Sequence, residues 1–249
     1  MNRKDFKFYA YTTLFVLLFM FRGTDICAQE KKKELTEPKV IQPGKRGKAP
    51  SDAIVLFDKG SLNKFESIKD GAPANWKVSG RKFTVTPGTT DIQTKQAFGD
   101  CQLHIEWSTP VQDVKDKKEG QGCGNSGVYL MGKYEIQVLN SYNNKTYFDG
   151  QAGAIYSKYP PLVNASLKPG EWQIYDIIFT APTYNNSILK TLGYFTVFHN
   201  GVIVQNHKDI GEPTRSANVN APDGVSRLPL MLQNHGNKVS YRNIWIREL

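Results

Sequence analysis

The sequence has few of the residues from which metal centres and crosslinked scaffolds are built. It contains three cysteines and four histidines among 249 residues. It has no His-x-His or His-Glu-x-x-His spacing, no Gly-x-Ser-x-Gly elbow and no phosphate-binding P-loop. These absences argue against a histidine-based metal site, a serine hydrolase with a nucleophile elbow and a P-loop nucleotide-binding protein.

Cysteine is too scarce for a disulfide framework. Cys27 lies near the N-terminus, so only Cys101 and Cys123 fall in the main body of the chain. Each of these two opens a predicted strand, and the two strands are expected to be antiparallel neighbours. Their Cα atoms would then lie at opposite ends, too far apart for a disulfide. We therefore expect two unpaired thiols.

Long hydrophobic runs are also missing, apart from Tyr11–Phe21. Three basic residues precede this run: Arg3, Lys4 and Lys7. Basic residues, a short apolar run and then Cys27-Ala28-Gln29 are the layout of a secretory signal peptide, and the run is short for a membrane span. Residues 1–28 are thus predicted to be a signal peptide cut after Ala28, giving a periplasmic or otherwise exported protein. A lipoprotein cut before Cys27, leaving a lipid anchor, is the alternative.

The net charge of +9 does not indicate a nucleic-acid partner. Residues 1–28 carry four basic and two acidic groups, and residues 29–50 carry seven and three. Only three of the nine net positive charges therefore belong to residues 51–249. Because residues 29–50 have few large apolar side chains, they are predicted to be a charged, disordered linker.

Residues 51–249 show many short, alternating apolar runs and no sustained 3.6-residue period. Turn residues separate these runs, and His199-Asn200-Gly201 indicates a hairpin. The pattern predicts a single all-β domain, a jelly-roll sandwich of two antiparallel sheets. The predicted strands are Ile54–Phe57, Trp76–Ser79, Lys82–Thr86, Gln102–Trp107, Ser126–Leu130, Tyr134–Leu139, Trp172–Phe179, Gly193–Phe198, Val202–Gln205, Leu228–Asn234 and Val239–Arg247.

Polar side chains recur on one face of several predicted strands. Glu135 and Gln137 alternate with apolar residues on one predicted strand, and His104 and Glu106 do so on another. If the strands were neighbours in one sheet, these polar faces would form one surface suited to sugar hydroxyls. An ordinary solvated face is the alternative. The proposed surface contains Glu106, Glu135, Gln137, Gln233, His235 and Arg242.

Aromatic residues and loops carry weaker signals. For each of the four tryptophans, a position in the core is favoured over a role as a stacking platform for a sugar ring. They are Trp76, Trp107, Trp172 and Trp245. Three long polar connections are candidates for functional loops: Thr109–Gly124, Ser141–Gly153 and His207–Ser226.

A series of motifs occurs in a fixed order along the domain. These are Gly124–Leu130, Tyr134–Leu139, Gly153–Tyr156, Gly170–Trp172, His199–Gly201, Leu232–Gly236 and Tyr241–Ile244. In this order they resemble the 3-keto-disaccharide hydrolase family, also called domain of unknown function 1080, over Ala53–Leu249. The resemblance implies a concanavalin A-like jelly roll. It also implies a substrate class, glycosides oxidised to a ketone at C3.

Retaining β-glucanases of the same fold carry Glu-x-Asp-x-x-Glu on their catalytic strand. Here the corresponding positions are Glu135, Gln137 and Asn140. Retaining hydrolysis needs two carboxyl groups that flank the bond, and an amide cannot donate and recover the proton. Ordinary glucanase chemistry would therefore need Glu106 as a second carboxyl group.

A 3-keto sugar needs only one base, because the ketone acidifies the hydrogen on C2. We expect Glu135 to remove this proton and His235 or Arg242 to stabilise the enolate. The C1 substituent then leaves by elimination, with or without rehydration to net hydrolysis. The expected substrate-binding residues are Glu106, Asn125, Gln137, Tyr156 and Gln233.

Three alternatives to this mechanism remain. A non-catalytic carbohydrate-binding module could use the same fold. A conventional glycosidase could pair Glu106 with Glu135. No cofactor is predicted, but a divalent cation held by Glu135 and His235 could polarise the ketone.

Overall fold

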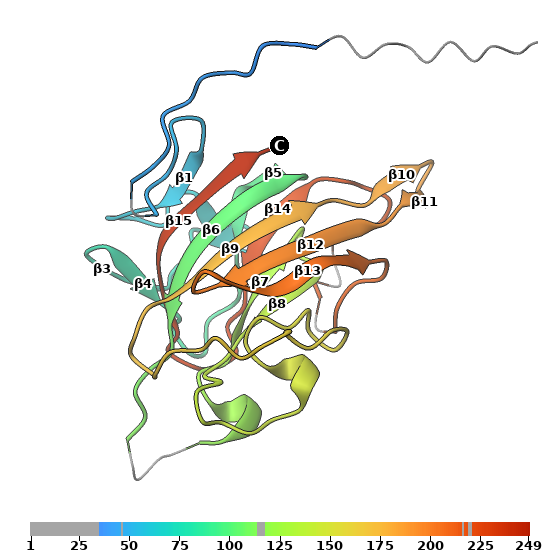
Figure 1. Cartoon of the computed structure of the whole chain (residues 1–249). Helices are drawn as coiled ribbons and strands as arrows, with labels where there is room; N and C mark the ends of the chain where they lie inside the picture. The colour runs from blue at the N-terminus through green and yellow to red at the C-terminus, as the bar shows by residue number, and fades with distance from the viewer. Residues whose placement is uncertain (1–34, 46, 114–117, 216, 219–220) are drawn as a thin grey trace, which may run out of the picture. The chain divides into compact units, whose positions relative to one another are not determined.

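The structure, a computed structural model, describes residues 35–249 except 46, 114–117, 216 and 219–220 (Figure 1). The predicted signal peptide lies outside the described residues. The chain divides into two units, Met1–Lys39 and Val40–Leu249, and the second is the folded domain. Residues 35–39 have no regular secondary structure. Within the described part of the chain, no helix is long and apolar enough to cross a bilayer.

The larger sheet has eight antiparallel strands. Its path runs in the order β13, β12, β9, β6, β15, β4, β3, and β1 pairs with β15 at the side. The strands of this sheet are β13 (Val202–Ile210), β12 (Gly193–His199), β9 (Gln173–Thr180), β6 (Cys101–Ser108), β15 (Ser240–Glu248), β4 (Lys82–Thr84), β3 (Lys77–Ser79) and β1 (Ile54–Phe57).

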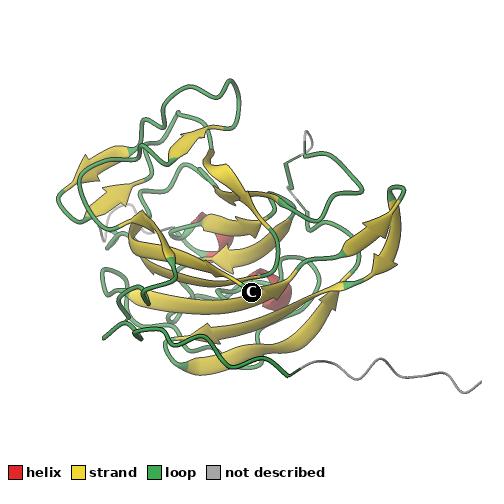
Figure 2. Ribbon diagram, turned by 90° about the horizontal axis from the view of Figure 1, so that it is seen from above, coloured by secondary structure: helices red, strands yellow, loops and turns green. Residues whose placement is uncertain are grey.

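The second sheet has five antiparallel strands in the order β2, β5, β14, β7, β8. Their bounds are β2 (Phe65–Ser67), β5 (Ile92–Phe98), β14 (Leu228–Leu232), β7 (Ser126–Leu130) and β8 (Tyr134–Val138). A separate hairpin pairs β10 (Thr183–Asn185) with β11 (Ile188–Thr191). Among the described residues, short 3₁₀ helices lie in the connections as η2 (Gly120–Gly122) and η3 (Phe148–Gly150), drawn red in Figure 2.

The hydrophobic core lies between the two sheets. Alternate residues of β6 and β8 belong to the same buried cluster, among them Ile105 and Ile136. Polar atoms also join the layers: the Tyr175 hydroxyl on β9 donates to the backbone oxygen of Gln137 on β8 at 2.7 Å. The predicted concanavalin A-like jelly-roll sandwich of two antiparallel sheets is therefore confirmed.

Four strands were not predicted: β2, β5, β10 and β11. The alternation of apolar residues in β5 is interrupted in the sequence. Thr94 is fully buried there, at a position where an apolar residue would be expected. Its hydroxyl accepts the backbone N–H of Leu230 and donates to the backbone oxygen of Gln96. Strand β13 also runs to Ile210 rather than ending at Gln205.

Cys101 and Cys123 are both free and buried, as expected. The reason given for this was wrong, because Cys101 opens β6 in the eight-stranded sheet. Cys123 precedes β7 in the five-stranded sheet, so the two strands are not neighbours. Three tryptophans are buried, and Trp172 is only partly so.

The last part of the predicted linker packs on the domain. The backbone oxygen of Gly47 accepts hydrogen bonds from Asn243 Nδ2 at 3.0 Å and Trp245 Nε1 at 2.9 Å, both on β15. The backbones of Gln42 and Ser51 are also hydrogen bonded at 3.0 Å. The packed chain therefore begins before Ser51, upstream of the predicted domain boundary.

Candidate functional site

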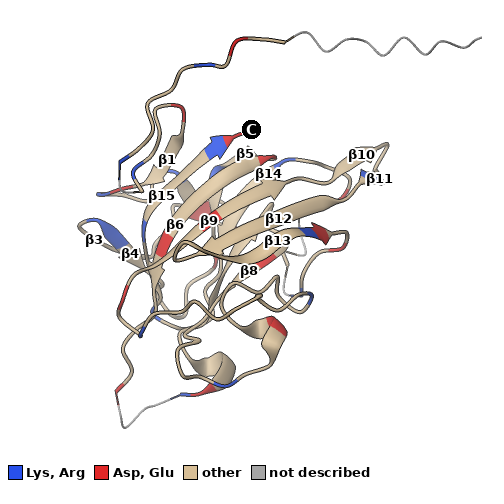
Figure 3. Ribbon diagram, viewed as in Figure 1, with Lys and Arg blue, Asp and Glu red and all other residues tan. Residues whose placement is uncertain are grey.

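The outer face of the five-stranded sheet carries Glu135 and Gln137, as their alternation on β8 predicts. The strand register places Tyr129 of β7 opposite Glu135 and Gly127 opposite Gln137. On the other side of β7, the backbone N–H of Gln233 donates to the oxygen of Gly127 at 3.0 Å. Figure 3 shows in red where acidic residues lie along the strands of the sandwich. Glu135, Gln137 and Gln233 are therefore brought together.

The carboxyl group of Glu135 is held by a short chain of hydrogen bonds. Tyr129 Oη donates to Glu135 Oε2 at 2.7 Å, and Gln233 Nε2 donates to Tyr129 Oη at 3.1 Å. The residue is only 2% exposed. Burial raises the pKa of Glu135 to about 8; the Tyr129 hydrogen bond opposes this rise and the charge of Asp91 adds to it. The group is therefore largely protonated at neutral pH.

The amide of Gln137 is fixed in one orientation. Its Nε2 donates to Gln121 Oε1 at 3.0 Å and to the backbone oxygen of Gly150 at 3.4 Å. Asn125 Nδ2 in turn donates to the backbone oxygen and Oε1 of Gln121, so Asn125 supports this arrangement indirectly. Gln137 Oε1 is buried and meets no donor among the residues described. A buried acceptor of this kind calls for a hydroxyl or a water.

Tyr156 lies at the border of this site. Its backbone N–H donates to the backbone oxygen of Glu135 at 3.1 Å. Its hydroxyl lies 2.6 Å from that of Tyr147, which is exposed together with the neighbouring Phe148. The Tyr147–Tyr156 pair thus belongs to the connection that follows β8 and packs back on that strand.

His235 is not on a strand face shared with Gln233, because β14 ends at Leu232. It is exposed in the β14–β15 connection, close to Asp91. Burial raises the pKa of Asp91, while the backbone N–H of Asn234 and the charge of His235 oppose the rise. Asp91, Tyr129 and Gln121 were not among the predicted site residues. Tyr129 reaches the site through the pairing of β7 with β8, whereas Gln121 belongs to η2 and Asp91 directly precedes β5.

The prediction that Glu106 and Arg242 share this surface is wrong. Both belong to the eight-stranded sheet, where Arg242 Nε donates to Glu106 Oε2 at 2.5 Å. They lie on its outer face, because the alternate residue Ile105 points into the core. The core therefore separates Glu106 from Glu135. The two carboxyl groups cannot flank one glycosidic bond, which removes the conventional glycosidase pair.

Glu106 and Arg242 are part of a charged cluster on that face. Asn243 Nδ2 donates to Glu106 Oε1 at 2.7 Å, and the Arg242 guanidinium stacks 4.0 Å above the Trp172 ring. Burial opposes ionisation of Glu106. Its contact with His104 and the hydrogen bonds from Asn243 and Arg242 nevertheless lower its pKa to about 2. The cluster is therefore a stable ion-pair network.

His104 completes the network. Its Nδ1 lies 2.6 Å from Asp176 Oδ1, and its ring stacks on Trp245. Burial acts to lower the pKa of His104, but the contacts with Asp176 and Glu106 raise it to about 9. His104 is thus charged at neutral pH and binds two carboxylates.

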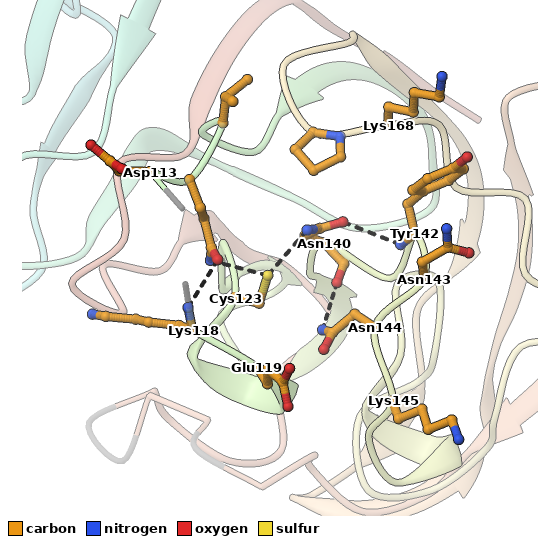
Figure 4. Close-up of a pocket in the computed structure, with 13 residues that line it drawn as sticks. Asp113, Lys118, Glu119, Cys123, Asn140, Tyr142, Asn143, Asn144, Lys145 and Lys168 are labelled. Carbon is orange, nitrogen blue, oxygen red and sulfur yellow. Dashed lines mark hydrogen bonds between the residues drawn. The ribbon is translucent and has the colours of Figure 1, made fainter. Parts of the chain in front are cut away.

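A pocket of about 790 Å³ lies at one end of the sandwich, between the loops that follow β6 and β8 (Figure 4). Cys123 Sγ accepts hydrogen bonds from Gln112 Nε2 at 3.1 Å and Asn140 Nδ2 at 3.0 Å. Their side-chain oxygens accept the backbone N–H groups of Lys118 and Tyr142. These amides are occupied within the protein, and no predicted site residue lines the pocket.

Clusters of metal-ligating side chains are absent from residues 35–249, apart from 46, 114–117, 216 and 219–220, which the structure does not describe. No group of three or more His, Cys, Asp or Glu side chains gathers there as a metal ion would need. Glu135 and His235, the two ligands of the cation alternative, belong to no such group in this part of the chain. No step of the proposed reaction is therefore assigned to a metal.

The sandwich fold and its polar outer face define a carbohydrate-active domain of the glycosyl hydrolase type. The chain belongs to the 3-keto-alpha-glucoside-1,2-lyase-like domain family, which matches residues 52–247. This is the family that the ordered motifs resemble.

Two solved structures from Parabacteroides distasonis ATCC 8503, both candidate glycosyl hydrolases, are similar to the chain. The first is 46% identical with a TM-score of 0.79, covering 88% of this chain and 96% of its own. The second is 19% identical with a TM-score of 0.57, covering 80% and 94% respectively, and supports the fold alone. No curated protein sequence matches the chain.

Proposed function

We propose that this protein cleaves 3-keto-glycosides and that Glu135 is the base that removes the proton from C2. The observation that supports this most directly is the position of Glu135. It is the carboxyl group on the outer face of β8, held by Tyr129 and flanked by the free acceptor of Gln137. A single well-placed base with a raised pKa suits abstraction of a proton beside a ketone.

The reaction follows from this arrangement. Glu135 takes the C2 proton, and the C–H electron pair forms an enolate with its charge on the C3 oxygen. The enolate then collapses back to the ketone as C1=C2 forms and the bond from C1 to the leaving oxygen breaks. The leaving oxygen takes up a proton, Glu135 releases the one it accepted, and addition of water across C1=C2 would complete net hydrolysis.

The remaining polar groups have supporting roles in the proposal. Gln137 Oε1 accepts a sugar hydroxyl, since its amide orientation is fixed by Gln121 and Gly150. His235, exposed near Asp91, is the proposed donor to the enolate oxygen. Arg242 is not assigned this role, because it lies on the other sheet. Since Glu135 is 2% exposed, substrate reaches it only when the side chains that cover it move.

The test is product analysis by NMR with a 3-keto-glucoside in deuterated water. The wild type should incorporate deuterium at C2 and release the C1 substituent. Glu135→Gln should do neither while keeping its circular dichroism spectrum, and Glu106→Gln should retain turnover as a matched control. Full activity of Glu135→Gln would refute the base assignment.

Two further arms of the same experiment test the alternatives. Loss of turnover with a chelator, restored by a divalent cation, would establish the metal-assisted reaction. Binding of unmodified sugars on a glycan array, with no turnover of any keto sugar, would establish a binding module.

A further inference from the structure

Tyr129 lies between Gln233 and Glu135, and the directions of its hydrogen bonds are determined. Its oxygen accepts the N–H of Gln233 Nε2 at 3.1 Å. The single hydroxyl hydrogen is then free to point at Glu135 Oε2, which is 2.7 Å away. Tyr129 is fully buried, so water does not compete for these positions. The Oε2 atom of Glu135 is thereby committed to an acceptor role.

Gly127 provides the space for the other carboxyl oxygen. A Cβ at this position would lie 2.5 Å from Glu135 Oε1 and 2.6 Å from Tyr129 Cε2. Gly127 is not among the residues with positive φ, so its backbone conformation is open to other residues. The absence of a side chain, and not backbone freedom, is what this position needs. Glu135 Oε1 therefore lies over the backbone of β7.

We propose that Tyr129 is a positioning residue that fixes Oε2 of Glu135, and that Gly127 provides the gap in which Oε1 alone meets the substrate. This inference rests on the proposed function. Because Tyr129 donates to Oε2, the abstracted proton is received by Oε1. The C2–H bond of the sugar must then approach from the side of Gly127, with Gln137 next to it as a hydroxyl acceptor.

The first test is Tyr129→Phe, which removes the donor and keeps the ring. The hydrogen bond from Tyr129 favours the ionised form of Glu135. Its loss should move the acidic limb of the pH–kcat profile to higher pH by about one to two units, since a hydrogen bond to a charged group contributes roughly 1.5–3 kcal/mol. Tyr194→Phe on β12 is the matched control. It should leave the acidic limb of the pH–kcat profile at the wild-type position.

An infrared titration of the protonated carboxyl group tests the same contact without relying on turnover. The band assigned to Glu135 is the one that disappears in Glu135→Gln. In Tyr129→Phe it should persist to higher pH than in the wild type. If neither the band nor the limb moves, Tyr129 only fills space and the proposal is overturned.

Gly127→Ala tests the gap and also covers the case in which Tyr129→Phe does not fold. The added methyl group should displace Oε1 and lower kcat at least tenfold with a smaller change in KM. Gly211→Ala is the control, because there the new Cβ meets only the end of Leu192 at 3.3 Å. Unchanged kcat in Gly127→Ala would overturn the proposal.

Failure of the proposed function and failure of the Tyr129 contact give different results. If the protein turns over no 3-keto-glycoside but the infrared band shifts in Tyr129→Phe, the contact stands and the proposed function falls. If Glu135→Gln abolishes turnover but Tyr129→Phe leaves the infrared band unchanged and Gly127→Ala leaves kcat unchanged, the proposed function stands. The inference about Tyr129 and Gly127 is then wrong.

Discussion

Arg242 Nε lies 2.5 Å from Glu106 Oε2, on the face of the sandwich that points away from Glu135. Arg242 belongs to one of the motifs that resemble the family, and Glu106 lies opposite it on the neighbouring strand. The ion pair nevertheless faces Trp172 and Asn243. The family motifs thus include residues that stabilise the eight-stranded sheet as well as residues of the candidate site.

Replacing Arg242 with Met should therefore affect stability more than turnover. Glu106 is largely buried and would keep Asn243 and His104 but lose one charged partner. A loss of about 1–3 kcal/mol in the free energy of unfolding is expected. Urea titration measures this, and the NMR assay should show a kcat close to that of the wild type. A large loss of kcat in a folded variant would show that Arg242 takes part in the reaction.

The pH dependence of turnover should reflect the raised pKa of Glu135. A base must be ionised, and burial brings this pKa to about 8. We expect kcat/KM for a 3-keto-glucoside to rise tenfold per pH unit below this value and to level off above it. Initial rates between pH 5 and 10 would show the limb. A profile that is flat between pH 6 and 9 would contradict the assignment.

The same carboxyl group should make stability depend on pH. Its folded pKa is raised from an ordinary value of 4.5, so its contribution is fully present below 4.5 and is lost as the pH rises through about 8. Glu135→Gln cannot ionise and should gain stability relative to the wild type across this window, at up to about 1.4 kcal/mol per pKa unit. Chemical unfolding at pH 4.5, 6 and 9 would test it. A constant difference between the two proteins would be evidence against a raised pKa.

His104 should show a separate pH window. Its folded pKa of about 9 lies above the ordinary value of 6.5. Its contribution is therefore fully present below pH 6.5 and is lost as the pH rises through 9. His104→Gln should lower the free energy of unfolding by about 1–3 kcal/mol at pH 6 and by much less at pH 10. Equal losses at both values would mean that packing on Trp245, not charge, dominates.

The sequence predicts most strands because alternate residues of each pack into the core between the sheets. Ser126–Leu130 was placed at its observed bounds, and the face assignment of Glu135 and Gln137 was correct. Strand β5 escaped prediction because the hydroxyl of Thr94 satisfies a backbone donor inside the core. Alternation identifies the face that packs into the core, and it fails where a polar group on that face is buried with a partner.

The partners within each sheet could not be predicted in the same way. Period-2 alternation shows that Glu106 and Glu135 both point away from the core, but both outer faces of a sandwich meet that description. The choice of sheet depends on pairing between distant segments, such as β6 with β15 and β7 with β14. Tyr129 shows the same limit, since its role arises from the neighbouring strands that supply Glu135 and Gln233.

The backbone oxygen of Gly47 has a practical consequence for preparing shortened forms of the protein. Trimming to the family boundary at residue 52 would remove the acceptor shared by Asn243 and Trp245. Two donors on β15 would lose their partner, and the stacked pair of Trp245 and His104 would become open to water. Expression trials should therefore start at or upstream of Val40, where the packed unit begins.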